Sequence, residues 1–291
     1  MIDIKFHCDE KENFHNNFSV RAFTYKNYSI EMHNHDFYEV NIIFSGNGTH
    51  CIESGRFRVK SGDVFVIPPM VAHAYTDTYN LEVYHILLQK SFVTKNKSET
   101  EKVDGFLQLT EIEPFLRSNF SSAFFLHLNS LQLVQLKNEL EFIDDKSTFS
   151  WKKYAPLKYH TTWKIIYWFS ALLKEQINSA TEVSKNKYEH QIIETLEYIH
   201  KNYGEKITVE ILYKREFLSR STFLRNFKAV CGMSPMEYLN YYRCRKAIEQ
   251  LNNSEYSKTE IAHNCGFYDL SHMQRTLKSV AKLNTLGIPP L

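Results

Sequence analysis

The chain has 291 residues, of which 43% are apolar and 23% are charged. This length is more than one hydrophobic core usually holds, so we expect two domains, and the apolar content excludes a disordered chain. The net charge of +2 is divided unevenly along the chain. Residues 184–291 hold 16 Lys and Arg against 11 Asp and Glu, while the preceding part is net acidic. This asymmetry favours a polyanion as the partner of the C-terminal part.

The first residues predict no secretion signal, because charged side chains stand where such a signal has an apolar run. The most apolar stretch, residues 163–173, contains Lys164 and is shorter than the roughly 20 residues that cross a bilayer. The five cysteines have no CxxC spacing, which indicates buried, reduced thiols rather than disulfides or a zinc site. We therefore expect a soluble, cytoplasmic protein with no membrane partner.

Residues 18–90 alternate between apolar and polar positions as β-strands do. The alternation is clearest in four segments, residues 39–44, 56–59, 64–67 and 81–88. Turn signals lie between them at residues 45–48, 54–55, 61–63 and 68–69. Short strands at this spacing, with glycine at the corners, predict a barrel or a sandwich.

Three histidines and a glutamate in this region form a pattern with a chemical meaning. On a strand, His33 and His35 point to one face because side chains alternate with period two, and Glu39 has the same parity. His73 would complete a set of three nitrogens and one oxygen, which suits a divalent metal such as Zn, Ni, Mn or Fe. A divalent metal on these four residues is the only cofactor that the pattern suggests.

The order of these residues resembles the two motifs of cupin barrels. The resemblance also takes in Gly46 and the segment 62–68, and it implies a small barrel with an inward-facing site. The chain departs from the motifs at Met70, where cupins have glycine, and at Asp77, where they have asparagine. The alternative to a metal is that the same side chains line a pocket or bond within the barrel wall.

After about residue 95 the apolar period becomes helical. Residues 131–142 and 159–177 predict two helices, and the second is apolar nearly all round. Such a helix is buried either within its own domain or in a homodimer, and the periodicity does not distinguish the two. Residues 179–187 are polar and aperiodic, as expected for a linker.

Beyond the linker the sequence predicts only helices and contains a weak repeat. Ser221, Arg225 and Lys228 recur fifty residues later as Ser271, Arg275 and Lys278. Each copy predicts two helices joined by a short turn: residues 209–216 followed by 219–230, and residues 258–264 followed by a helix from 269 or 270 to about 280. Residues 217–218 form the first turn and residues 265–267 the second.

A helix pair of this kind can place its second helix in a major groove, where Arg and Lys neutralise phosphates and the N-terminal residues reach base edges. An ordinary helical bundle with solvated arginines would show the same spacing. The repeat with retained basic residues favours DNA.

The residues from 218 to 267 resemble the AraC/XylS family of bacterial transcription regulators. The segments that carry the resemblance are Leu218–Lys228, Gly232–Leu239, Arg243 with Ala247, Glu260–Ala262 and Cys265–Phe267. The resemblance covers about residues 188–285 and implies two helix–turn–helix subdomains joined by a helix at about 235–251. It also implies recognition helices at about 219–230 and 270–280, which enter two successive major-groove faces roughly 34 Å apart.

Three departures from this family concern the turns and the end of the chain. Tyr213 replaces a small alanine at the helix crossing, and Phe217 replaces a frequent turn glycine. A bulky residue with positive φ costs about 1 kcal/mol, so we expect the first turn to be rearranged. Residues 281–285 also lack the usual pattern, so a different ending of the second subdomain is expected.

The sequence thus predicts an α+β protein of two domains. Residues 1–178 form a cupin-like barrel (about 18–90) with flanking helices (about 100–178), residues 179–187 a linker, and residues 188–291 an all-α domain with two helix–turn–helix units. The expected DNA contacts are Ser219, Arg220, Ser221, Thr222, Leu224, Arg225, Lys228, Ser271, His272, Gln274, Arg275 and Lys278.

We expect a sequence-specific transcription regulator, not an enzyme, whose barrel binds a small-molecule effector such as a sugar. Sensor cupins of similar regulators often keep the His-x-His pair without metal, and the expected pocket residues are then His33, His35, Tyr38, Glu39 and His73. Expected partners are double-stranded DNA, a second copy of the chain, and RNA polymerase if the protein activates transcription. One alternative is a barrel that only dimerises or contacts partners, and another is a metal-dependent cupin enzyme.

Overall fold

Two long strands, β4 (Tyr38–Ile52) and β7 (His73–Leu88), organise the N-terminal part by pairing antiparallel. The predicted turn at residues 45–48 is wrong, because β4 runs through it. The pairing with β7 shifts register between Ile43 and Thr49 instead. A Cβ on Gly46, whose φ is +74°, would lie 2.2 Å from the Asn80 carbonyl oxygen. Gly46 therefore lies in an irregularly paired part of β4 rather than in a hairpin turn.

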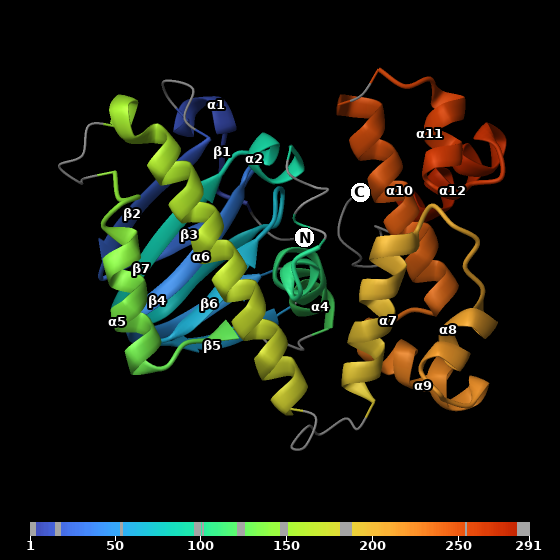
Figure 1. Ribbon diagram of the computed structural model, residues 1–291, viewed down its shortest axis with the longest axis horizontal. Coiled ribbons are helices and arrows are strands. Elements are labelled where there is room, and N and C mark those ends of the chain that lie inside the picture. The colour runs from blue at the N-terminus through green and yellow to red at the C-terminus, as the bar shows by residue number, and fades with distance from the viewer. Residues whose placement is uncertain are drawn as a thin grey trace. The chain divides into compact units, whose positions relative to one another are not determined.

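The computed structural model describes residues 4–14, 19–52, 55–95, 100, 102–120, 126–145, 151–180, 188–253 and 255–283. The chain divides into two compact units, Met1–Ala180 and Thr181–Leu291. The first contains the sheet and the second contains only helices in its described residues (Figure 1). Among the described residues, no helix is both long enough and apolar enough to cross a membrane.

The sheet has eight strands in the order β1–β3–β7–β4–β6–β8, with β2 paired to β7 and β5 paired to β4. The other strands are β1 (Phe6–Cys8), β2 (Val20–Lys26), β3 (Ile30–His35), β5 (Gly55–Lys60), β6 (Asp63–Ile67) and β8 (Leu126–His127). Strands β1 and β8 lie outside the predicted span of about 18–90. They have three and two residues, which is too short for a period-two pattern to reveal.

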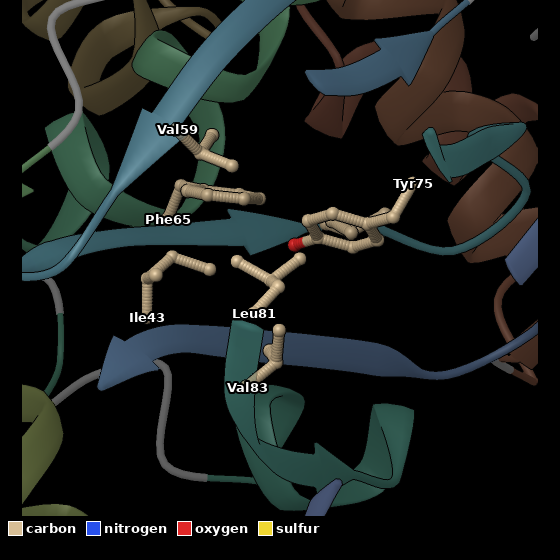
Figure 2. Packing of buried hydrophobic residues seen from close by; sticks show 7 residues of the cluster. Ile43, Val59, Phe65, Tyr75, Leu81 and Val83 are labelled. Carbon is tan, nitrogen blue, oxygen red and sulfur yellow. The ribbon is translucent and has the colours of Figure 1, made fainter. Parts of the chain in front are cut away.

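Alternation along β4 sends neighbouring side chains to opposite faces of the sheet. Ile43, Phe65 and Tyr75 belong to one buried cluster, which Figure 2 shows converging between the strands. Tyr38 and Val40, of opposite parity, line a small apolar cavity on the other face together with residues of helix α6 (Trp151–Ala180). The inner face therefore carries Glu39, and the outer face packs against helices.

Helix α6 crosses the outer face of the sheet (Figure 1). Trp163, Ile166 and Phe169 are buried and line the same cavity, whereas Ala171 is exposed and Tyr167 is half-buried. Within a single chain the helix is thus buried mainly on one side. Its apolar side packs within its own unit. The other helices in the described part of this unit are α1 (Glu10–Asn13), α2 (Lys90–Thr94), the π-helix η1 (Gln108–Ile112), α4 (Glu113–Phe120) and α5 (Ser130–Leu140).

The C-terminal unit consists of α7 (Glu189–Asn202), α8 (Val209–Arg215), α9 (Arg220–Cys231), α10 (Pro235–Asn253), α11 (Lys258–Asn264) and α12 (Leu270–Leu283). These bounds agree with the predicted helices to within a few residues. Of the predicted linker, residues 179 and 180 belong to α6, and residues 181–187 lie outside the described part. Of the atypical ending, residues 281–283 continue α12, and residues 284 and 285 also lie outside the described part.

Candidate DNA interface and barrel site

The first helix–turn–helix, α8 with α9, is fixed by caps and by a buried aromatic pair. The Ser219 hydroxyl accepts a hydrogen bond from the Thr222 backbone N–H at 3.2 Å, which starts α9 at the predicted cap. Phe223 and Phe227 are completely buried against neighbouring helices of the unit. Because these two residues occupy the inner face of α9, the residues between and beside them face outward.

The turn between α8 and α9 keeps the left-handed conformation. Phe217 has a φ of +55° and Gly266, in the second turn, has a φ of +75°. The expected rearrangement of the first turn is therefore wrong: the backbone accepts the strain of a bulky residue, because Ser219 and Phe223 already fix where α9 begins.

Arg243 of α10 lies beside the turn of the second helix–turn–helix, α11 with α12. Its guanidinium donates to the carbonyl oxygens of Tyr203 and Glu205, each at 2.7 Å. A Cβ on Gly266 would lie 2.6 Å from both that guanidinium and the Tyr203 carbonyl, so the turn requires glycine. Asp269 caps α12 by accepting the His272 backbone N–H at 2.6 Å.

Most of the predicted DNA contacts lie on the outer side of the two second helices. Arg220 and Arg225 on α9 and Arg275 on α12 are exposed, and within the described residues they form no hydrogen bond or ion pair. The other exposed members are Ser219, Ser221, Lys228, Ser271, Gln274 and Lys278, and the half-buried ones are Thr222, Leu224 and His272. These residues form a basic, hydrogen-bonding surface of the kind that contacts phosphates and base edges.

Inside the barrel, Glu39 is the centre of a buried cluster of histidines. Its Oε2 lies 3.1 Å from Nε2 of His35 and 3.2 Å from Nε2 of His73, and its Oε1 lies 2.5 Å from Nδ1 of His85. Burial alone would raise the pKa of Glu39, but the close imidazoles of His35, His73 and His85 outweigh it and hold the pKa well below its usual range. Glu39 is therefore an anion surrounded by imidazoles.

The hydrogen bonds of the Nδ1 atoms of His35 and His73 show which ring nitrogen of each carries the proton. Nδ1 of His35 lies 2.8 Å from the Phe37 carbonyl oxygen, and Nδ1 of His73 lies 3.1 Å from that of Val71. A carbonyl oxygen only accepts, so both Nδ1 atoms carry hydrogen, and in a neutral ring the Nε2 atom then has only a lone pair. Two lone pairs and a carboxylate oxygen would face one another. A cation or two extra protons must lie between them.

These residues fit a divalent transition metal. The ligand atoms of His35, Glu39 and His73 all lie within 4.8 Å of one another and are buried. The Nδ1–H bonds to carbonyls are the outer-sphere contacts that orient metal-binding histidines. Burial lowers the pKa of His73, which disfavours the extra protons as the alternative. The donor set of two nitrogens and one carboxylate suits zinc, nickel or iron.

Two members of the predicted barrel site are placed differently. The His33 ring lies 4.2 Å from the His73 ring, measured between centroids, and is tilted by 51° to it, but His33 is not in the close ligand group. Burial lowers the pKa of His33 to about 4, so its ring is neutral near pH 7. Tyr38 lies on the outer face under α6, away from Glu39, which corrects its assignment to the pocket. The reason is parity, since it is one residue from Glu39 on the same strand.

Four buried polar residues near this site were not among the predicted site residues. The side-chain atoms without a hydrogen-bond partner are both polar atoms of Asn41, both ring nitrogens of His50, the Tyr75 hydroxyl and Nε2 of His85. Asn41 pairs across the strands with His85, and His50 with Tyr75. The parity of Asn41 with Glu39 was a usable signal. The others require the β4–β7 register, which sequence alone does not reveal.

Comparison with known proteins gives matches over both units. Residues 15–139 match the model of the AraC-like ligand binding domain, and residues 212–284 match a helix-turn-helix domain. The transcriptional activator RhaS of Escherichia fergusonii is 27% identical over 244 residues, which are 82% of this chain and 80% of RhaS. RhaS of Yersinia pestis is 25% identical over 248 residues, which are 84% of each chain. The structure of ToxT from Vibrio cholerae is 14% identical, covers 90% of this chain and 94% of ToxT, and has a TM-score of 0.33.

Proposed function

Because this chain belongs to the AraC/XylS family of transcription regulators, we propose that α9 and α12 are its two recognition helices, reading successive major-groove faces of one DNA site. The protein is a DNA-binding regulator with a ligand-binding domain, rather than an enzyme. We infer that the protein acts in the cytoplasm, where its DNA is.

The main support for this assignment is that α9 and α12 are both capped at their N-termini and carry exposed arginines. Ser219 and Asp269 fix the N-termini of α9 and α12, and the arginines that follow them are exposed. A preorganised helix loses little conformational entropy on binding, and a free guanidinium is available for a guanine edge or a phosphate. An arginine with a salt bridge would first have to lose that partner.

Replacing Arg225 by alanine is expected to weaken binding to the operator about 5- to 150-fold, which corresponds to about 1–3 kcal/mol for a lost base contact. The measurement is fluorescence anisotropy of the full chain with duplexes from the region upstream of its own gene and with random duplex. The matched control is Arg58→Ala, which removes an exposed arginine from β5 in the other unit.

Wild-type affinity should fall steeply with salt concentration and should be higher for a subset of sequences. If Arg225→Ala binds as tightly as Arg58→Ala, Arg225 is not a contact. If the wild-type chain binds none of the duplexes, the assignment of α9 and α12 fails as a whole.

For the regulatory ligand, we assign the inner face of the barrel around Glu39. A metal ion held by His35, Glu39 and His73 would supply the positive charge that the facing lone pairs require. The buried polar atoms of Asn41, His50 and Tyr75 that have no hydrogen-bond partner are donors and acceptors for a small polar organic effector such as a sugar. These two ligands are compatible, because the polar atoms belong to different residues.

Titration of the metal-free full chain with Co(II) is expected to give the visible d–d absorption of a site with histidine nitrogens, with a stoichiometry near one per chain. The control is Glu31→Gln, which changes an exposed glutamate on β3 and should behave like the wild type. Absence of the spectrum at millimolar Co(II) would show that the cluster binds protons rather than metal. An organic effector would then be the sole ligand.

Two further partners are part of the proposal. A second copy of the chain would place two DNA-binding units on adjacent sites and raise the effective affinity. RNA polymerase is the partner if the protein activates transcription.

A further inference from the structure

The two most exposed large hydrophobic residues of the described chain lie in the two helix–turn–helix turns. Phe217 is 96% exposed and Tyr268 is 85% exposed, whereas the next, Tyr79, is 69% exposed. Phe217 stands two residues before the cap of α9, and Tyr268 stands directly before the cap of α12. Each recognition helix is therefore preceded by one aromatic side chain in solvent.

Phe217 is costly in the free protein for two independent reasons. Its φ of +55° is a conformation that bulky residues avoid, and the corresponding turn of the second unit has Gly266. Its phenyl ring lies almost entirely in water and so gains nothing from packing. Glycine at residue 217 would remove both costs. The contacts of Ser219 and Phe223 hold the strained backbone, but they do not require a bulky residue at 217, so the exposed ring suggests a contact made outside the free chain.

Tyr268 is held in place although its ring is exposed. Its backbone N–H donates to Nδ1 of His272 at 3.3 Å, within the same first turn of α12 that Asp269 caps. His272 also packs edge-on against the buried ring of Phe267, at 5.5 Å between ring centroids. The backbone from which the phenol projects is therefore anchored to the start of the recognition helix.

The ligand that both turns can share is DNA, because each turn leads directly into one of the two recognition helices. The exposed Arg220 lies three residues after Phe217, and the exposed Arg275 lies seven residues after Tyr268, so each aromatic residue leads into a recognition helix that carries an exposed arginine. Tyrosine hydroxyls are frequent phosphate donors, and phenyl rings make apolar contacts with thymine methyl groups.

Resting on the proposed function of α9 and α12, we propose that Phe217 and Tyr268 are DNA contacts in their own right. Phe217 packs against a thymine methyl or a deoxyribose at the edge of the first groove, and the Tyr268 hydroxyl donates to a phosphate beside the second. The two turns thus extend the DNA contacts beyond the recognition helices, with one apolar and one polar contact.

The decisive variant is Phe217→Gly in the full chain, because strain and binding then change in opposite directions. Its melting temperature, followed by circular dichroism at 222 nm, should rise by roughly 4 °C as the strain is relieved. Its affinity for the operator should fall about tenfold, with an unchanged dependence on salt because no charge is lost. Tyr268→Phe should lose affinity severalfold. Tyr79→Ala, which removes an exposed ring from the other unit, should match the wild type.

The outcomes separate this inference from the proposed function. If the wild-type chain binds DNA and Phe217→Gly binds equally tightly, Phe217 is not a DNA contact and the recognition helices stand. If Phe217→Gly binds normally but fails to activate transcription with purified RNA polymerase, the turn is a protein-binding surface and the inference is wrong. If the wild-type chain binds no DNA, the proposed function itself fails.

Discussion

Replacing Arg117 by alanine is expected to lower the free energy of unfolding of the N-terminal unit by about 3–5 kcal/mol. Arg117 is 1% exposed, and its Nε donates to Glu113 Oε1 at 2.8 Å. Its Nη2 donates to the Val66 carbonyl oxygen, and its guanidinium lies 4.9 Å from the centre of the Phe65 ring. The variant would leave Glu113 buried without its cation and a strand carbonyl without its donor.

The chain provides a specific readout for this variant. Its three tryptophans all lie in α6, so tryptophan fluorescence during urea denaturation reports on the N-terminal unit rather than on the helical unit. The matched control is the double variant Arg117→Met with Glu113→Leu, which removes both charges and keeps their volume. It should recover most of the lost stability, because burying a well-packed apolar pair costs less than burying one unpaired charge. A single variant within 1 kcal/mol of the wild type would refute the argument.

The second large effect concerns Glu39. Replacing it by leucine is expected to destabilise the N-terminal unit by about 3 kcal/mol or more and to abolish Co(II) binding. The reason is that Nε2 of His35, Nε2 of His73 and Nδ1 of His85 all lie within 3.2 Å of this one carboxylate, which is the anionic partner of His85 and of the cation or protons between the other two rings. A buried polar group left without its partner costs about 1–3 kcal/mol. Glu39→Gln keeps one oxygen and the shape of the side chain, so its stability should be intermediate.

Tryptophan fluorescence and the Co(II) spectrum would be measured on the same samples. If Glu39→Leu is as stable as the wild type, the histidines do not depend on the carboxylate, and the cluster is not organised around it. If Glu39→Leu is destabilised but still gives the full Co(II) spectrum, Glu39 is a structural anion and the metal site lies elsewhere.

What the sequence could predict depended on how local the signal is. The helix–turn–helix boundaries follow from a cap such as Ser219 and from the spacing of Phe223 and Phe227, all within one or two turns of helix. The inward parity of His33, His35 and Glu39 is equally local. These features were therefore predicted to within a few residues.

What escaped prediction depended on pairing between distant strands. The hydrogen bond from His85 to Glu39 spans 46 residues, and only the β4–β7 register brings the two together. The glycines at 46 and 48 carry the same local signal in a bulge as in a turn, so the run through residues 45–48 was misassigned. Tyr38 was grouped with its sequence neighbours although alternation sends it to the opposite face.

Strand β4 links the candidate ligand site to helix α6, because its side chains alternate between the two faces of the sheet. Glu39 faces the candidate ligand site, and Tyr38 and Val40 on either side of it face the cavity under α6. A shift of β4 therefore affects both of its faces. A ligand that moves Glu39 toward the inner face also moves Tyr38 and Val40 away from helix α6. Helix α6 ends at Ala180, the last residue of its unit. A change in how α6 packs on the sheet would therefore move the point at which the chain continues into the helical unit.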